Sequence, residues 1–397
     1  MSIFIGVRSV TRGNYGIFAL TTLMMLFIYM SLLFLPSLIQ GVVNRVNGQL
    51  VNTLTSDIVI TSGTRAASIA DADSLLAKVR DTSGVAHATA VVRVGNQISH
   101  EGSTGSYPVA AIDPTSYAEV FTTPTNLLAG RYLTDRDTDA AFLGIGVAGT
   151  GQTNVRGYKS SLEDVYTNDQ VAITLGNGRT DNFSVVGIYD NQFPLSDDNA
   201  YITMSEADQL IPGISNTASA IYVRTDNGAD VNRVVGKLAA LQSGIKLETS
   251  ADLGSAVAEQ VATFSLVSDI LKIVWLVMAA ITIFIITYVD LVNKRRQIGI
   301  QRAIGISSTS IVLSYVLKAL AYALVGVGSG FLIFQYALSP IVQGHPFEFP
   351  NGPVTLAATP SEIVSDLVVM VVVASIAALI PALRSVRLRI LDAIWGP

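Results

Sequence analysis

Between two long apolar stretches the chain reads Asn293-Lys294-Arg295-Arg296-Gln297-Ile298-Gly299-Ile300-Gln301-Arg302-Ala303-Ile304-Gly305. Upstream, Ile273 to Val292 is mostly apolar, and so is Ile311 to Leu338 downstream. Each stretch is long enough to cross the hydrocarbon core of a bilayer, which needs about 20 apolar residues in a helix. The basic run is therefore predicted to be the turn between two membrane-spanning helices.

Two further stretches meet the same length requirement. Ile17 to Ile39 carries no charge, and Ile363 to Leu383 carries only Asp366. The residues that follow the first stretch, Gln40-Gly41-Val42-Val43-Asn44, contain no small-x-small cleavage pattern, so we expect this helix to be retained as an anchor. The sequence predicts four spanning helices.

The short segments outside the spans differ in their content of lysine and arginine. These residues are Arg8 and Arg12, then Lys294, Arg295, Arg296 and Arg302, and finally Arg384, Arg387 and Arg389. The loop from Ser339 to Pro360 has none. Because cytoplasmic loops are enriched in Lys and Arg, both termini and the 293–310 turn are expected in the cytoplasm, with residues 45–262 and 339–360 outside.

The predicted fold is a membrane α-helical protein with four transmembrane helices and a large α+β extracytoplasmic domain between helices 1 and 2. We expect it in the cell membrane. The predicted segments are 1–16 (cytoplasmic), 17–39 (transmembrane helix 1), 40–272 (stalks and extracytoplasmic domain, with an insert at about 105–215), 273–292 (transmembrane helix 2), 293–310 (cytoplasmic turn), 311–338 (transmembrane helix 3), 339–362 (extracytoplasmic loop), 363–383 (transmembrane helix 4) and 384–397 (cytoplasmic tail).

The composition excludes several classes of function. Residues 45–262 hold 14 basic and 24 acidic side chains, a net charge of −10 that argues against nucleic acid as a partner. The chain has no cysteine, so disulfides, thiolate metal sites and a cysteine nucleophile are excluded. Its three histidines, His87, His100 and His345, have no second ligand at helical spacing, which argues against a metal site or a Ser-His-Asp hydrolase.

Both ends of the outer segment have helical patterns. Apolar residues recur every three or four positions at Val42, Val43, Val46, Leu50, Val51 and Leu54, and at Leu253, Val257, Val261, Phe264 and Leu271. This spacing predicts two paired stalk helices, 40–54 and 253–271, that continue from spans one and two. Two independent surface helices are the alternative.

Between the stalks the sequence alternates between strand-like and helical runs. Stretches rich in β-branched residues predict strands at 57–61, 90–94, 107–112, 170–175, 183–189 and 220–224. Helical patterns occupy 71–79, where Asp71 can cap the helix, and 229–241. Because 57–79 and 220–241 each read strand then helix, we expect a split β-α-β arrangement around a β-rich insertion.

The 293–310 turn carries more detail than charge alone. A short amphipathic helix is predicted around Gln297 to Ile304, with Ile298, Ile300, Ala303 and Ile304 apolar, bracketed by Gly299 and Gly305. Such a helix can lie at the membrane surface and present a face to a cytoplasmic partner. The alternative is a basic topology signal without a partner.

At this turn the chain resembles a known family. Arg296-Gln297-Ile298-Gly299-Ile300-Gln301-Arg302-Ala303-Ile304-Gly305 is similar to the pattern R-E-I-G-I-x-(R/K)-A-(I/L)-G of MacB/FtsX-type ABC transporter permeases, and Ile380 to Leu388 resembles their closing segment. Three further stretches resemble family motifs in the same order: Ala110 to Pro114, Leu128 to Leu133 and Val185 to Tyr189. The chain departs from the pattern at Gln297 (usually Glu), Ile390 (often Pro) and Lys318 (commonly acidic), which puts individual ion pairs to an ATPase in doubt.

The resemblance implies a four-helix permease that forms a homo- or heterodimer and docks cytoplasmic ATPase subunits on the 296–305 turn. The ATPase-coupling residues would be Arg296, Gln297, Ile298, Gly299, Ile300, Arg302, Ala303, Ile304 and Gly305. The chain has no Gly-x-x-x-x-Gly-Lys-(Ser/Thr) motif, so it is not expected to be an enzyme or to hold a cofactor, and the partner would bind ATP and magnesium.

Small and charged residues inside the predicted spans can be explained by structural roles as well as by functional ones. Gly326 and Gly330 lie one turn apart and predict close helix packing of the small-xxx-small kind, not phosphate binding. Lys318, Asp366, Lys272 and Asp290 are charged residues in or beside the spans. Because each lies within about two turns of a predicted end, snorkelling to the interface would be enough to accommodate it.

The function expected from this pattern is that of a permease subunit in an ABC transporter. ATP hydrolysis by the separate ATPase would move the stalks and the outer domain and so export or extract a hydrophobic, lipid, lipoprotein or peptide substrate. The alternative is an FtsX-like scaffold that activates an extracytoplasmic hydrolase. The expected partners are the ATPase, a second permease copy, membrane lipids and an extracytoplasmic accessory protein.

Overall fold

The computed structural model describes residues 15–63, 68–149, 161–162, 164–253, 255–349 and 352–386, with backbone alone between 255 and 265. The predicted stalk residues Val257, Val261 and Phe264 therefore have side chains outside the described part. The chain divides into two units. The helical unit comprises Met1–Val43, Gln260–Phe347 and Val354–Pro397, and the sheet unit comprises Asn44–Glu259 and Glu348–Pro353.

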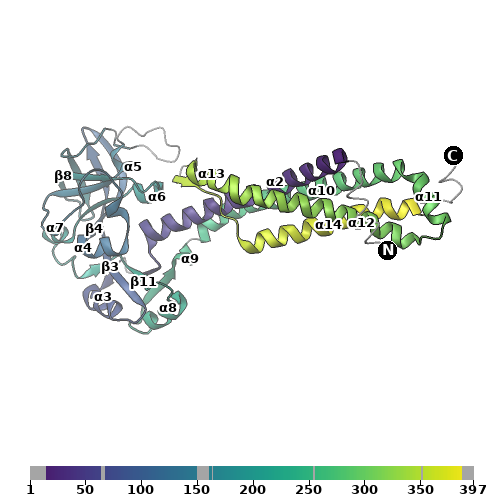
Figure 1. The fold of residues 1–397 in the computed structure, drawn as a ribbon. Coiled ribbons are helices and arrows are strands. Elements are labelled where there is room, and N and C mark those ends of the chain that lie inside the picture. Colours follow the sequence, from purple (N-terminus) through teal and green to yellow (C-terminus); the bar gives the residue numbers. More distant parts are fainter. Residues whose placement is uncertain are drawn as a thin grey trace. The chain divides into compact units, whose positions relative to one another are not determined.

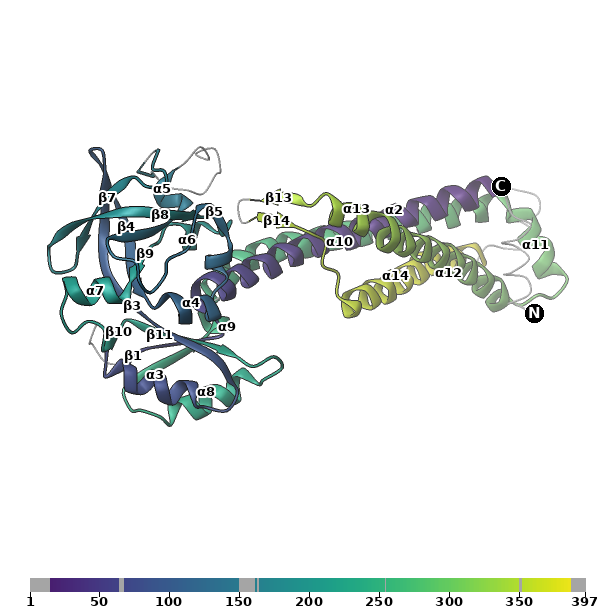
Figure 2. The same ribbon diagram turned by 60° about the vertical axis from the view of Figure 1, so that its left-hand side comes forward.

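The helical unit is built on four long helices that run alongside one another (Figures 1 and 2). They are α2 (Tyr15–Leu50), α10 (Ser255–Asn293), α12 (Ser308–Ile333) and α14 (Pro360–Val386). Each contains a stretch long and apolar enough to cross a membrane, with mean hydropathy between 1.9 and 2.7. The four predicted spans therefore correspond to four apolar helices.

The helices of spans one and three both extend beyond their apolar stretches. Beyond Leu50, α2 continues as a π-helical turn, η1 (Val51–Thr55). Where a loop was predicted from residue 339, that prediction was wrong, because the chain stays helical through η3 (Phe334–Leu338) and α13 (Ser339–Gly344). A short hairpin of β13 (Phe347–Phe349) and β14 (Gly352–Val354) follows.

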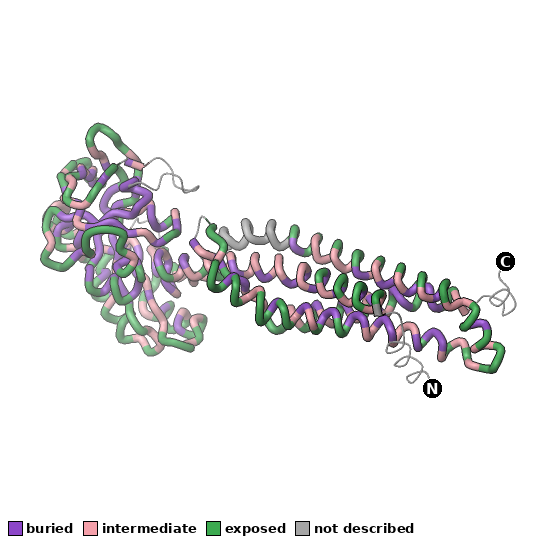
Figure 3. The backbone as a smooth tube through the Cα atoms, turned by 45° about the horizontal axis from the view of Figure 1, so that its top comes forward, coloured by how far each residue is buried: buried purple, intermediate pink, exposed green. Residues whose placement is uncertain are grey.

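The core of the helical unit combines large side chains on α2 with small ones on its neighbours. Met25, Tyr29 and Leu32 of α2 are almost fully buried. They pack in one cluster with inward-facing alanines of the other helices, namely Ala279, Ala319, Ala323, Ala374 and Ala378. Figure 3 shows buried positions alternating with exposed ones along these helices. The exposed positions carry many large apolar side chains, among them Ile273, Ile281 and Leu332, as expected for helices surrounded by lipid.

The sheet unit contains two interleaved strand-helix-strand units. The first is β1 (Ile58–Ser62), α3 (Ala72–Arg80) and β3 (Val85–His100), and the second is β11 (Ala220–Thr225), α8 (Val231–Ala239) and β12 (Ile245–Thr249). Their strands lie in the order β12-β1-β11-β3, with every adjacent pair antiparallel. This is a split β-α-β arrangement, and α3 and α8 cover one face of it over a core that includes Ile60, Leu75 and Leu238.

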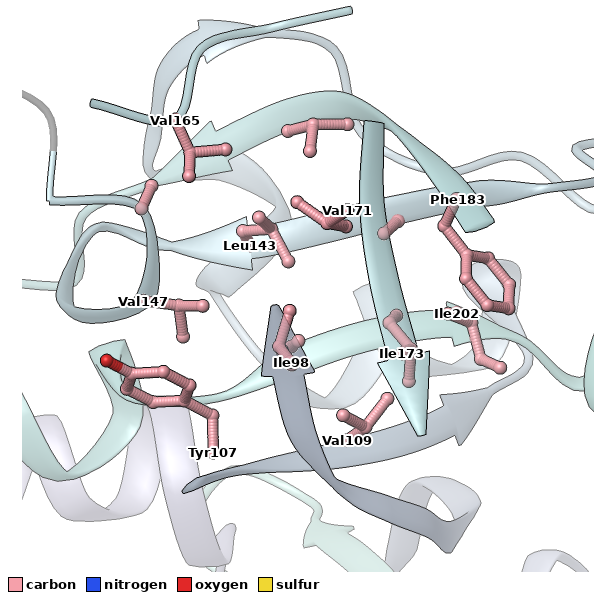
Figure 4. Packing of buried hydrophobic residues seen from close by; sticks show 14 of the residues in the cluster. Ile98, Tyr107, Val109, Leu143, Val147, Val165, Val171, Ile173, Phe183 and Ile202 are labelled. Atoms are coloured by element: carbon pink, nitrogen blue, oxygen red, sulfur yellow. The ribbon is translucent and has the colours of Figure 1, made fainter. Parts of the chain in front are cut away.

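The same sheet continues through a β-rich part between the two units. From β3 the order runs to β4 (Ser103–Ile112), β9 (Ala200–Thr203), β6 (Ala140–Gly144), β8 (Thr180–Tyr189) and β5 (Leu127–Gly130), while β7 (Gln170–Leu175) pairs with β3 and β8. The strands enclose a mainly aliphatic core, shown in Figure 4 around Ile98, Leu143 and Ile173, which also includes the rings of Tyr107 and Phe183. A short two-stranded sheet joins β2 (Ile69–Ala70) to β10 (Thr217–Ala218).

The other helices described in the sheet unit are short. They are α4 (Pro114–Val120), α5 (Ile145–Ala148), α6 (Pro194–Asp197), α7 (Met204–Leu210), α9 (Ser250–Leu253) and the 3₁₀ turn η2 (Thr123–Thr125). Asp113 caps α4, since its Oδ1 accepts from the Ser116 N–H at 2.8 Å, and Asp230 caps α8 in the same way. The predicted cap at Asp71 was wrong, because Asp71 has φ 52° and its side chain accepts no hydrogen bond from α3.

Candidate functional site

The basic turn folds as the helix α11 (Arg295–Ala303), which begins two residues before the predicted start. It follows directly on α10, which ends at Asn293. Gly305 has φ +93°, a conformation that favours glycine, and it ends the helical run before α12. The helix is therefore fixed at both ends by its neighbours.

The predicted apolar face of this helix is divided between two sides. Ile298 is 5% exposed and packs with Leu291, Ile311 and Ala382 of the three adjoining helices. Ile300 and Ile304 are 47% and 73% exposed. Grouping these residues on one face was wrong, because successive helical residues turn by about 100° and Ile300 thus lies on the side away from Ile298. Ile298 and Gly299 anchor the helix, and Arg296, Gln297, Ile300, Ala303 and Ile304 form its outer face.

A pocket of about 280 Å³ lies between α11 and the ends of α10 and α14. Arg295, Arg302 and Arg384 line it, together with Gly299, and none of the lining residues that the structure describes is a carboxylate. The Nε of Arg295 is buried and has no hydrogen-bond partner in the part of the chain that the structure describes. Because a buried guanidinium nitrogen without a partner is costly, this pocket is suited to accept an anionic group from another molecule.

Next to α11, three charged residues form a cluster. The Nζ of Lys318 lies 2.7 Å from one carboxylate oxygen of Asp290, and the Nζ of Lys294 lies 3.3 Å from the other. The Lys318 side chain is 8% exposed, and its Nζ lies 5.7 Å from the ring centre of Tyr322. Snorkelling was therefore the wrong prediction for Lys318, which links α12 to α10 inside the helical unit.

A second ion pair joins α10 to α14. The Nζ of Lys272 lies 3.5 Å from Oδ1 of Asp366, whose side chain is 11% exposed. Lys318 and Asp366 do not pair with each other: Lys318 pairs with Asp290 and Asp366 with Lys272. Sequence reasoning missed both pairs that do form. For Lys318 and Asp290 there was a usable signal: they lie equally far from Ile304 along the chain, which places them at the same depth in a helical hairpin.

Gly326 and Gly330 of α12 lie against α2 of the same chain. A Cβ atom on Gly326 would come within 2.5 Å of the Met25 Cβ, and one on Gly330 within 3.1 Å of the Leu26 carbonyl oxygen. Gly328, between them, faces open space. The two glycines thus allow close approach of two helices within one subunit.

We expect Gly326→Leu to destabilise the helical unit, because α2 must move away to admit the side chain. Overpacking of this kind costs about 1–3 kcal/mol. The measurement is thermal unfolding of the purified protein in detergent, with Gly328→Leu as the matched control that should behave like the wild type. Equal midpoints for both variants would show that the contact with α2 contributes nothing.

The family-like motifs of the sheet unit at 128–133 and 185–189 have structural roles. Gly130 and Gly187 let β5 and β8 approach closely, since a Cβ on Gly187 would lie 2.2 Å from the Arg131 carbonyl oxygen. Arg131 forms a bidentate pair with Asp137 through two hydrogen bonds of 2.7 Å. That pairing holds the pKa of Asp137 at about 2, below its ordinary value. Among the described residues no group of three His, Cys, Asp or Glu side chains is placed to hold a metal ion.

Comparison with known proteins agrees with this organisation. The model of the MacB-like periplasmic core domain matches residues 18–241, and that of the FtsX-like permease C-terminal region matches residues 270–390. A search among curated proteins gave no match.

Two of the solved structures that resemble the chain are distant from it in sequence. The periplasmic region of MacB from Actinobacillus actinomycetemcomitans is 14% identical over 53% of this chain and 95% of that one, with a TM-score of 0.38. The extracellular domain of the noncanonical ABC-type transporter YknZ from Gram-positive bacteria is 14% identical over 49% of this chain and all of that one, with a TM-score of 0.34. The two family models together extend over both units, and the chain belongs to the MacB/FtsX-type ABC transporter permeases.

Proposed function

We propose that this ABC transporter permease docks its ATPase on the outer face of α11 and converts ATP hydrolysis into movement of the sheet unit. Permeases of this family work with a cytoplasmic ABC ATPase. The substrate we propose is hydrophobic: a lipid, lipoprotein, peptide or small molecule that is exported or extracted. We further propose that two permease copies act together, with both termini and α11 in the cytoplasm.

The observation that carries this proposal is the division of α11 into an anchored and an exposed side. Ile298 is held among the ends of three long helices, so a displacement of α11 must move those helices. On the other side, Ile300 and Ile304 expose apolar surface beyond the apolar part of the spans, where a soluble protein could cover it. The arginine-lined pocket beside it would accept a carboxylate of the ATPase.

The experiment is site-specific photo-crosslinking in cells that co-express the permease with its ATPase. A photoreactive amino acid at Ile304 should crosslink to the ATPase, which also requires that α11 face the cytoplasm. The matched control is Leu332, which is 54% exposed on a spanning helix and should not crosslink to it. In addition, Arg302→Glu should weaken co-purification of the ATPase by at least about tenfold, because like charges at an interface cost several kcal/mol and about 1.4 kcal/mol already corresponds to a factor of ten.

Two results would contradict the proposal. One is crosslinking from Leu332 as strong as that from Ile304. The other is unchanged co-purification and unchanged ATP-dependent transport in Arg302→Glu, which would show that α11 is only a topology signal.

A further inference from the structure

The sheet unit contains a cleft of about 830 Å³ that neither the family assignment nor the coupling proposal explains. It lies over the strands β1, β11, β3, β4 and β9, which can be followed in Figure 2. Its volume falls within the range of small-molecule sites, about 300–1,000 Å³. Every lining residue belongs to the sheet unit, so an inference about the cleft does not depend on how α11 works.

The strand register determines which side chains form the floor. Val59 of β1 pairs with Tyr222 of β11, and Ala220 of β11 pairs with Val91 of β3. Because partners in register point to the same face and side chains alternate along a strand, these residues share one side of the sheet. Alternate residues such as Ile60 and Ile221 point to the other side, beneath α3 and α8.

Further along β3, the same face continues into the β-rich part. Arg93 pairs with Ala110 of β4, and Ala110 pairs with Tyr201 of β9. The helix α4 covers this face over Ile112 and Tyr201. The small residues Ala110 and Ala220 lie on this face and line the cleft, and they form its floor.

The wall of the cleft is aromatic and rigid. Tyr117 and Phe121, in and just after α4, lie with ring centres 4.7 Å apart, Tyr117 lies 5.2 Å from Tyr201, and Phe121 lies 5.1 Å from Tyr222. Such contacts hold rings in place and offer apolar and polarisable surface to a ligand. The four rings thus form one continuous aromatic wall from Tyr201 to Tyr222.

Among the described residues that line the cleft, Arg93 is the one that carries a charge. Its side chain is exposed, and no carboxylate of the described residues lies within ion-pair distance of it. Its backbone N–H donates to the Ser219 Oγ at 2.9 Å, which fixes the strand at this point. Burial raises the pKa of Tyr222, and the positive charge of Arg93 opposes that rise, so the guanidinium lies near the aromatic wall. The segment 45–262 has more acidic than basic residues, and at the cleft it places the positive charge of Arg93 beside an apolar floor.

We propose that the cleft binds an amphipathic small molecule with an aliphatic or aromatic body and one anionic group. The body would lie on the small-residue floor against Tyr117, Phe121 and Tyr222, and the anion would pair with Arg93. A single cation excludes a polyanion such as nucleic acid, whose binding needs several phosphate contacts. The volume of the cleft suits a molecule the size of a fatty acid or a drug.

The test uses the full-length protein in nanodiscs of zwitterionic lipid. The probe is dodecanoate that carries a photoreactive diazirine, and mass spectrometry locates the labelled peptides. We expect labelling within 91–96 or 219–222, above the labelling of the spanning helices per residue. Diazirine-bearing dodecanol, which is neutral, should label these positions more weakly.

Two variants and a control test the assignment to Arg93. Arg93→Gln should reduce labelling by the anionic probe on the order of tenfold, the loss expected for a charged hydrogen bond. Ala220→Trp should block the floor and reduce labelling by both probes. Arg136→Gln is the control, because Arg136 is an exposed arginine of the same unit that does not line the cleft, and it should leave labelling unchanged.

Three results would overturn the proposal. The first is equal labelling by the anionic and the neutral probe with no effect of Arg93→Gln. The second is labelling confined to the spanning helices, which would mean that the probe only partitions into lipid. The third is protection of the cleft by a second copy, seen as a crosslink between protomers at Arg93 without labelling by either probe.

Discussion

We expect Val46→Pro to abolish transport while the partner ATPase continues to hydrolyse ATP. Val46 is 5% exposed and lies inside α2, which is helical from Tyr15 to Leu50 and has Pro36 near its middle, about three turns before Val46. Proline removes the hydrogen bond to residue 42 and clashes with its carbonyl, which costs about 3 kcal/mol and breaks the straight axis of the helix. Residues up to Val43 belong to the helical unit and those from Asn44 to the sheet unit. The break therefore falls close to the point where α2 passes from one unit to the other and, in the proposed mechanism, transmits the movement.

The contacts at the end of α2 explain why its direction matters. The Gln49 Nε2 donates to the Asn191 carbonyl at 2.7 Å, and the Asn52 carbonyl accepts from the Thr122 N–H at 2.9 Å. The Arg45 Nη2 donates to the Gln192 Oε1 at 2.9 Å. These bonds join the end of the helix to separate segments of the sheet unit. A rigid helix would move them together, whereas a broken helix would absorb the movement.

The measurement is transport per ATP hydrolysed in reconstituted vesicles. Val46→Ala removes the side chain but keeps the helix, and it should retain most of the coupling. Val261→Pro makes the equivalent break in α10, whose backbone is helical from Ser255 to Asn293. If both proline variants transport at the wild-type ratio, the two helices do not transmit the movement and the mechanism proposed here is wrong.

The sequence predicted the spanning helices well because a single property, hydropathy over a fixed length, decides them. It predicted strands less well. The predicted strand 90–94 is part of β3, which runs from Val85 to His100, and register shifts on both sides of Gly95 interrupt the alternation that would have revealed it. The strands β6 and β9 were missed because both their faces are buried, so Ala140–Gly144 and Ala200–Thr203 show no alternation.

The candidate site shows the same limit. The family motif predicted coupling residues that include Arg296 and Gly299, but only the fold shows which residues of α11 face inwards. The cleft in the sheet unit and the ion pairs of the buried lysines were missed for a different reason. Arg93 and Tyr222 belong to strands far apart in the chain, and their place in one cleft depends on the order β11-β3, which hydropathy does not encode. The partners of buried lysines likewise depend on helix rotation.

We expect Lys318→Met to cause the largest loss of stability, because it removes one of the two lysines that pair with the buried carboxylate of Asp290. The Asp290 side chain is 12% exposed, and Lys294 alone would remain beside it. Removing one partner of a buried ion pair costs about 3–5 kcal/mol, whereas replacing both partners can be nearly neutral. The double variant Asp290→Asn with Lys318→Met should therefore be more stable than the single variant. The observable is the thermal midpoint in detergent.

The same substitution should also weaken the coupling of α11. Lys294 leads directly into α11 and shares Asp290 with Lys318, so loss of Lys318 frees Asp290 to move toward the turn and shifts the start of the helix. Transport per ATP should fall in Lys318→Met and recover in part in the double variant. Lys78→Met, at an exposed lysine of α3 in the sheet unit, is the control and should alter neither quantity. If the double variant is as unstable as the single one, the ion pair between Lys318 and Asp290 does not hold α10 to α12. The loss of stability in Lys318→Met would then come from the packing of the lysine side chain against Tyr322.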